Sequence, residues 1–309
     1  MTVLDQNISR RLIFAIVLTT ITLVAEVVGG IWSNSLALLS DAGHVFLDLF
    51  ALLLSLGAIK LAAQPPNVRH SFGWHRAEVL AALINGLTVL LMAVLILYEG
   101  SKRLVTPEEV KTLPMLVIAV LGLIANLLAA KGLHGHSHDD LNVRSAFLHV
   151  LGDAAASVGV IAGAAIMWFT GWYQMDALIS IAIGLLILVG AGRVLRDAVH
   201  ILMEGVPRGM SVEQVAERIK EVEGVHDVHH INLWSVCSHI LALSVHVEVE
   251  RGYEMDRGKL LHRIEHLLEH QFHITHTTIQ LECSDCNGGP LIKPLQHTGR
   301  QDTCCGEDH

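Results

Sequence analysis

The chain has 309 residues, of which 52% are hydrophobic and only 17% charged, and its mean hydropathy is +0.49. A soluble globular protein carries about 25% charged residues, so this composition argues against a wholly soluble enzyme and against a disordered protein. The formal net charge of −9 argues against nucleic acid as a partner, which requires a basic face. Residues 201–309 hold 9 Lys and Arg against 17 Asp and Glu, a balance of −8. The chain therefore combines an apolar body with an acidic one.

Six stretches have the roughly 20 mainly apolar residues that a membrane-spanning helix needs. They are 12–31, 36–61, 77–100, 113–131, 146–169 and 176–195. Nine Lys and Arg lie on one side of these spans and three on the other. Because positive loops stay inside, we expect both termini in the cytoplasm, in a cell membrane protein.

Ionisable residues recur at helical spacing inside two of these spans. Asp41, His44 and Asp48 stand at i, i+3 and i+7, and His149 and Asp153 repeat the i, i+4 step. These spacings place the side chains on one face of each helix. Ionisable groups in a bilayer are costly and usually mark a pathway or a partner. His–Asp hydrogen bonds between helices are the simpler alternative.

Two imidazoles and two carboxylates match a four-coordinate site for a borderline cation such as Zn²⁺. Two carboxylates and one dication sum to zero charge, which avoids much of the cost of burying an ion. Copper(I) prefers thiolates, and the spans hold no Cys. Magnesium and calcium prefer oxygen ligands alone.

The motif from Ser40 to Asp48, together with His149 and Asp153, resembles the cation diffusion facilitator family in its zinc-type branch. The segments 71–78 and 278–282 are also similar to family motifs. The resemblance implies a homodimer, alternating access and proton-coupled efflux. It implies His44, Asp48, His149 and Asp153 as the transport site. Asp41 also recurs in the family motif, and we interpret it as a neighbour of the ligands or part of the entry path, not as a ligand.

A histidine must lose its proton to bind metal, so binding releases protons, and imidazole titrates within the physiological range. We therefore expect a proton-coupled antiporter that exports Zn²⁺ from the cytoplasm. The alternatives are a transporter on the same scaffold that exports mainly Cd²⁺, Co²⁺, Ni²⁺ or Fe²⁺, an intramembrane zinc hydrolase, and a metal-sensing receptor. A hydrolase keeps one coordination position open for water, whereas four ligands suggest a closed site and no enzyme.

Other polar residues in or near the spans indicate a metal site less specifically. We interpret Glu26, Asn85 and Asn126 as hydrogen-bonding groups between helices. His134, His136 and His138 lie in a short link where alternating His is typical of metal capture. A metal site near His70 and His75 is not assigned by the sequence.

The pattern changes after residue 204, where a capping box at Ser211 opens a helix. Strands are expected at 228–234, 241–250 and 277–282, and a second helix at 257–271. This α-β-β-α-β order predicts a small two-layer α+β domain, similar to the family's ferredoxin- or metallochaperone-like domain. We place the membrane domain at 1–203, this metal-sensing domain at 204–286 and a disordered tail with Cys304 and Cys305 at 287–309.

His246 and Glu282 fall on the polar faces of their strands, where metal ligands at a subunit interface would lie. The family resemblance adds His229, which alternation does not separate from His230, and His262 on the second helix. Cys283 and Cys286 form half of a zinc-knuckle pattern. We expect Zn²⁺ here as a regulator as well as a substrate, membrane lipid around the spans, and no organic cofactor.

Overall fold

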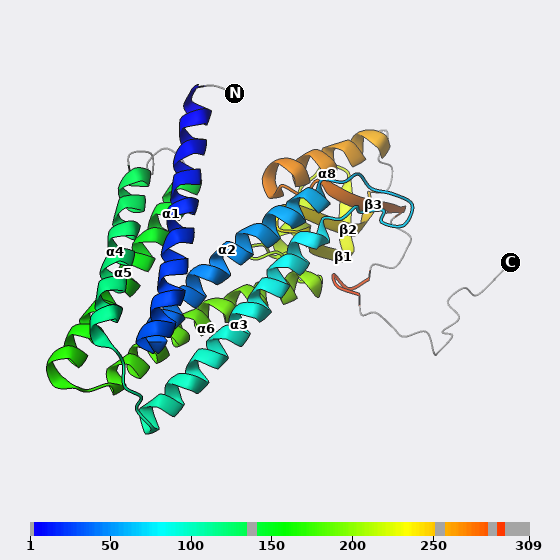
Figure 1. The fold of residues 1–309 in the computed structure, drawn as a ribbon. Coiled ribbons are helices and arrows are strands. Elements are labelled where there is room, and N and C mark those ends of the chain that lie inside the picture. The colour runs from blue at the N-terminus through cyan, green and yellow to red at the C-terminus, as the bar shows by residue number, and fades with distance from the viewer. Residues whose placement is uncertain (1–2, 135–140, 251–256, 284–288, 294–309) are drawn as a thin grey trace. The chain divides into compact units, whose positions relative to one another are not determined.

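The computed structural model describes residues 3–134, 141–250, 257–283 and 289–293, and the side chains at 17–128, 131, 151–250, 257–282 and 289–293. The chain forms two compact units. One contains residues 1–64 and 80–197, and the other contains residues 65–79 and 198–309. Eight helices and three strands lie in the described residues (Figure 1).

Six long helices follow one another from the N-terminus. They are α1 (Val3–Ser33), α2 (Leu36–Ala62), α3 (Arg76–Val105), α4 (Thr112–His134), α5 (Leu141–Thr170) and α6 (Gln174–Leu202). Over the described residues, four stretches are long and apolar enough to cross a membrane, and they lie in α2, α3, α5 and α6. The apolar parts of α1 and α4 that the structure describes, Val17–Ser33 and Thr112–Leu128, are shorter. The first unit is therefore a helical membrane domain.

Within the first unit, α1, α2, α4 and α5 pack together, and α3 packs against α6. Leu38 of α2, Met115 of α4 and Met167 of α5 are almost fully buried in one apolar cluster. Ile96 of α3 and Ile187 of α6 form another cluster. Gly184 of α6 allows a close approach here, because a Cβ added to it would lie 3.1 Å from Ile96.

The second unit contains the predicted α-β-β-α-β order: α7 (Val212–Lys220), β1 (Val225–Cys237), β2 (Ile240–Val249), α8 (Arg257–Phe272) and β3 (His276–Cys283). The three strands lie in the order β1-β2-β3, with β1 and β2 antiparallel and β2 and β3 parallel. Ser211 caps α7 by accepting a hydrogen bond from Gln214 N at 3.3 Å. The predicted fold class is confirmed.

The core of this unit lies between the helices and one face of the sheet. Val245 and Val247 alternate along β2 and pack with Ile219 of α7 and with Ile264 and Leu268 of α8, all fully buried. His246 lies between these valines along β2, and Glu248 follows Val247. Because side chains alternate along a strand, the two polar residues are on the opposite face, where β1 and β3 contribute further polar groups.

Candidate metal sites

A cavity of about 520 Å³ lies between α2, α3, α5 and α6 in the membrane domain. Its acidic and imidazole lining comes from Asp41, His44 and Asp48 of α2 and from Asp153 of α5. Spacings of three and four residues bring the α2 groups onto one helical face. Two helices that are about 100 residues apart in the sequence thus place ionisable groups in one cavity.

The α2 groups differ in their exposure within this cavity. Asp41 is only 4% exposed, whereas His44 and Asp48 are half-buried. His44 Nε2 lies 3.6 Å from Asp48 Oδ2, so the two side chains form a pair with each other. His149 is in α5, one helical turn before Asp153, and its side chain lies outside the described residues. The arrangement offers nitrogen and oxygen donors that suit a borderline divalent cation.

The cavity also contains a residue that the sequence analysis interpreted differently. Asn85 of α3 lines it, and Asn85 Oδ1 is buried and has no hydrogen-bond partner among the described residues. The expected hydrogen bond between helices is therefore not made by this oxygen. The sequence did not indicate that Asn85 faces a cavity, because hydropathy does not show on which side of α3 a polar residue lies.

Glu26 of α1 is buried, and one oxygen of its carboxyl group lacks the hydrogen bond that the sequence analysis expected. Its side chain is 2% exposed, and Oε2 has no hydrogen-bond partner among the described residues. A Cβ added at Gly122 of α4 would come within 3.0 Å of Glu26 Oε1, so the glycine makes room for this carboxyl group. Glu26 interacts electrostatically with Asp41 and Asp153, although it does not line the cavity.

The N-terminus of α2 is held by a carboxylate from α6. Asp176 Oδ1 accepts hydrogen bonds from Ser35 Oγ at 2.6 Å and from Ala37 N at 3.2 Å, and Oδ2 accepts one from Leu36 N at 2.7 Å. Arg103 of α3 lies 3.8 Å from the same carboxylate. Free N–H groups at a helix start favour an anion. Asp176 thereby fixes the helix that carries three of the four ionisable groups described in the cavity lining.

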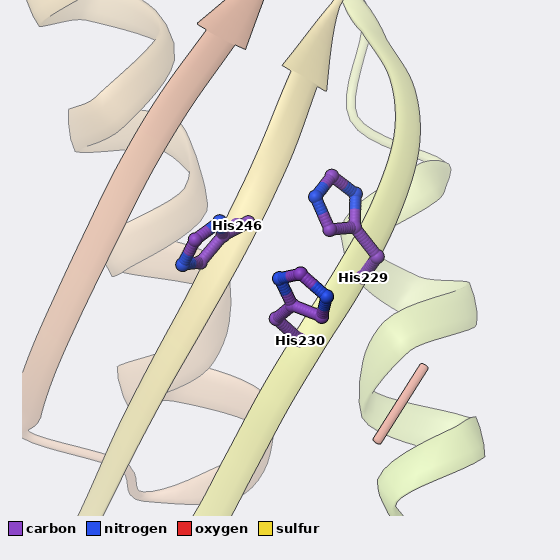
Figure 2. A group of neighbouring side chains, drawn as sticks. All are labelled: His229, His230 and His246. Atoms are coloured by element: carbon purple, nitrogen blue, oxygen red, sulfur yellow. The ribbon is translucent and has the colours of Figure 1, made fainter. Parts of the chain in front are cut away.

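A second group of possible ligands lies on the polar face of the sheet. One ligand atom from each of His229, His230 and His246 lies within 4.8 Å of the others, and Figure 2 shows the three imidazoles grouped over β1 and β2. Glu282 of β3 bridges two of them: Oε1 lies 2.6 Å from His246 Nδ1, and Oε2 lies 3.2 Å from His229 Nε2. We call these four residues the sheet cluster.

The backbone explains why both adjacent histidines of β1 belong to the sheet cluster. His230 has a positive φ of 49°, and the register of β1 against β2 shifts between His229 and Asn232. This irregularity breaks the alternation of side chains along the strand. Both histidines that the sequence left as alternatives, His229 and His230, therefore lie in the sheet cluster.

The donor set of the sheet cluster fits a zinc ion. His229 is 2% exposed, and Nδ1 of both His229 and His230 is buried without a hydrogen-bond partner among the described residues. Oε1 of Glu248, which is 5% exposed, has none either and lies 3.7 Å from His229 Nδ1. Such orphaned polar groups are costly unless a ligand satisfies them.

Electrostatics also favour a cation here. Burial acts to raise the pKa of Glu282, but the hydrogen bond from His246 and the nearby imidazoles hold it below its usual range. Burial, together with Lys293 and the neighbouring histidines, lowers the pKa of His230. A carboxylate that stays ionised and an imidazole that stays neutral are the forms that bind metal.

Other predicted ligands are not brought into the sheet cluster. His262 is exposed on α8, where its ring neighbours that of His266 with centroids 6.5 Å apart, and in the single chain it does not join the sheet cluster. Its role as a ligand at a subunit interface stays a prediction. The remaining candidates have side chains outside the described residues: Cys283 at the end of β3, His134 at the end of α4, and Cys286, His136 and His138.

Among the described residues, the loop between α2 and α3 contains no group of possible metal ligands. Asn67 Oδ1 accepts hydrogen bonds from the backbone of Arg69 and His70 at 2.9 and 3.0 Å, which stabilises a turn. The ring of His70 stacks on Trp74 with centroids 4.0 Å apart. Among the described residues this segment is organised by turn and ring contacts.

Two family models and several known proteins match most of the chain. Residues 12–203 match the model of the cation efflux transmembrane domain, and residues 207–284 match that of the cation efflux protein cytoplasmic domain. The zinc transporter ZitB of Escherichia coli K12 is 41% identical, covering 92% of this chain and 90% of that protein.

Two further relatives carry broader names. The cadmium, cobalt and zinc/H(+)-K(+) antiporter of Bacillus subtilis is 40% identical, covering 88% of each chain. The metal cation efflux system protein CzcD of Cupriavidus metallidurans is 40% identical, covering 90% of this chain and 87% of that one. These relatives are named as transporters and not as enzymes, and the second family domain is a dimerisation domain. The chain therefore belongs to the cation efflux family, the cation diffusion facilitators that its motifs resemble.

Proposed function

We propose that this protein exports Zn²⁺ in exchange for protons, by alternating access, through a site made of His44, Asp48, His149 and Asp153. The observation that carries this proposal is the cavity in which α2 and α5 bring His44, Asp48 and Asp153 together. The proposal adds His149 because residues four apart in a helix, such as His149 and Asp153 in α5, share one face. The relative ZitB is named a zinc transporter, which supports zinc as the cation.

Proton exchange follows from the ligand types. Each histidine must be neutral to bind the cation, so loading displaces any proton that it carries. Imidazole titrates near pH 6.5, so a modest difference in pH across the membrane changes the affinity of the site. Two carboxylates balance the charge of one dication, which lowers the cost of holding it in a membrane. The name of the Bacillus relative, an antiporter that includes H⁺, supports this exchange.

Both termini lie in the cytoplasm under this proposal, since the positively charged loops are on their side. The protein spans the cell membrane six times. His134, His136 and His138 then lie at the cytoplasmic mouth between the fourth and fifth spans, where they raise the local concentration of Zn²⁺.

The sheet cluster serves as a regulatory zinc site under this proposal. Two copies of the acidic C-terminal part repel one another, and cations bound at His229, His246 and Glu282 lower this repulsion. Zinc would then favour the paired domains of a homodimer. Crosslinking of the full-length protein in nanodiscs with and without Zn²⁺ tests this role, and equal crosslinking in both conditions contradicts it.

Zinc flux into proteoliposomes under an imposed pH gradient tests the transport site. Asp153→Ala removes one carboxylate from the cavity, and we expect flux to fall to background. Asp197→Ala, a change of the same kind in α6 at a residue that does not line the cavity, serves as the control and keeps its flux. Retained flux in Asp153→Ala contradicts the proposal. Assays with Cd²⁺, Co²⁺, Ni²⁺ and Fe²⁺ in the same vesicles show whether another cation is preferred.

A further inference from the structure

Asn85 is the neutral polar side chain of the transport cavity. It lies on α3, whereas the acidic and imidazole groups described there lie on α2 and α5. Its Oδ1 is buried and has no hydrogen-bond partner among the described residues. The next residue, Gly86, is buried against α6, where an added Cβ would come within 2.9 Å of Leu195. Close packing at Gly86 therefore holds this part of α3 beside the cavity.

The surroundings of Asn85 offer this oxygen few donors. Asp41, Asp48 and Asp153 are acceptors when ionised, and the neighbouring lining from α3 and α6 includes Val89, Ile183, Leu186 and Ile187. The imidazole of His44 can donate, but its Nε2 pairs with Asp48 at 3.6 Å. A buried acceptor without a donor is unfavourable, and such a group in a native protein calls for an explanation. An arriving cation supplies the missing donor, because water bound to a dication is a strong hydrogen-bond donor.

We propose that Asn85 Oδ1 accepts a hydrogen bond from a water carried by the cation as it enters the cavity. Asn85 thereby captures the partly hydrated ion before His44, Asp48, His149 and Asp153 replace its waters. This role rests on the proposed transport function and adds a contact from α3. It concerns capture, so it predicts an effect on apparent affinity and little effect on the maximal rate.

Zinc flux measured over a range of concentrations in proteoliposomes tests the contact. Asn85→Leu keeps the size of the side chain and removes its oxygen. We expect KM to rise about tenfold, as for the loss of one hydrogen bond, with the maximal rate within about twofold of the unchanged protein. Asn85→Asp keeps an oxygen acceptor, and we expect its KM to be at or below that of the unchanged protein.

Asn126→Leu is the matched control, because Asn126 is a half-buried amide on α4 that does not line the cavity. We expect its KM to be unchanged. A KM for Asn85→Leu within twofold of the unchanged protein overturns the inference. An equal rise in Asn85→Leu and Asn85→Asp also overturns it, because that result assigns the effect to the amide NH₂ group or to packing.

Two further measurements keep the result decisive. Size-exclusion profiles and thermal melting show whether each variant is folded, and Asn85→Ala replaces Asn85→Leu if the larger residue is not tolerated. Asp153→Ala is assayed in parallel: flux retained in that variant refutes the transport site itself, whereas an unchanged KM in Asn85→Leu refutes only the role of Asn85.

Discussion

Removal of the Asp176 carboxylate should destabilise the membrane domain strongly. The group is 1% exposed and receives hydrogen bonds from Ser35 Oγ, Leu36 N and Ala37 N. In Asp176→Ala the first N–H groups of α2 lose their acceptor, and Arg103 loses one of its anionic neighbours. Ser35 Oγ still accepts from Leu38 N at 3.2 Å, so one contact at the helix start survives.

The size of the effect can be worked from these contacts. Each hydrogen bond to a charged group contributes about 1.5–3 kcal/mol, but neighbouring contacts are not additive. Breaking a buried charged group away from its partners costs about 3–5 kcal/mol, which we take as the expected loss for Asp176→Ala. At about 2–4 °C per kcal/mol for a domain of this size, Tm falls by about 6–20 °C. Asp176→Asn, which keeps one oxygen acceptor, should lose about half as much.

Thermal unfolding of the purified full-length protein, followed by tryptophan fluorescence, measures this change. Glu108→Ala is the control in the same network, because Glu108 also contacts Arg103, at 3.3 Å, but its side chain is 44% exposed. Exposed ion pairs contribute less than about 1 kcal/mol. Equal shifts in Tm for Asp176→Ala and Glu108→Ala would refute the reasoning, because burial would then not distinguish the two carboxylates.

Two further predictions concern the C-terminal unit. Ile264→Ala removes a fully buried side chain from the core and should cost about 2–5 kcal/mol, measured as faster limited proteolysis of this unit; cleavage at the unchanged rate would contradict it. Glu282→Gln removes the charge that bridges His246 and His229, so calorimetric titration of the full-length protein should show weaker binding of its tightest zinc. Because the pKa of Glu282 is held below its usual range, its carboxylate stays ionised on mild acidification, so the loss of affinity in Glu282→Gln should persist at mildly acidic pH. Unchanged affinity in Glu282→Gln, at neutral or at mildly acidic pH, would contradict this second prediction.

Local patterns predicted much of the fold. The alternation of Val245, His246 and Val247 predicted a strand with one apolar face, and the structure has β2 there with both valines buried. The spacing of Asp41, His44 and Asp48 predicted one face of a helix, and all three line the cavity. Such periodicity is local, so it is visible without any knowledge of tertiary structure.

Features that depend on distant contacts or on unusual backbone were missed. Asp176 binds the start of α2 across about 140 residues of sequence, and no local pattern indicates such a pair. Asn85 reaches the cavity because of how α3 packs against α6. His230 joins the sheet cluster through a positive φ, which a strand pattern does not predict for a residue other than glycine.

The two groups of possible ligands differ in how far their side chains are exposed to water when no ion is bound, and this difference bears on their roles. The side chains of His44 and Asp48 are 35% and 38% exposed, so water reaches this pair when no cation is bound. His229 Nδ1, His230 Nδ1 and Glu248 Oε1 are buried and lack hydrogen-bond partners among the described residues. Ligands that water can reach release an ion at a lower cost than ligands that are left buried and unsatisfied. A site that must unload on every cycle needs the first arrangement, and a site that reports a steady zinc level is better served by the second.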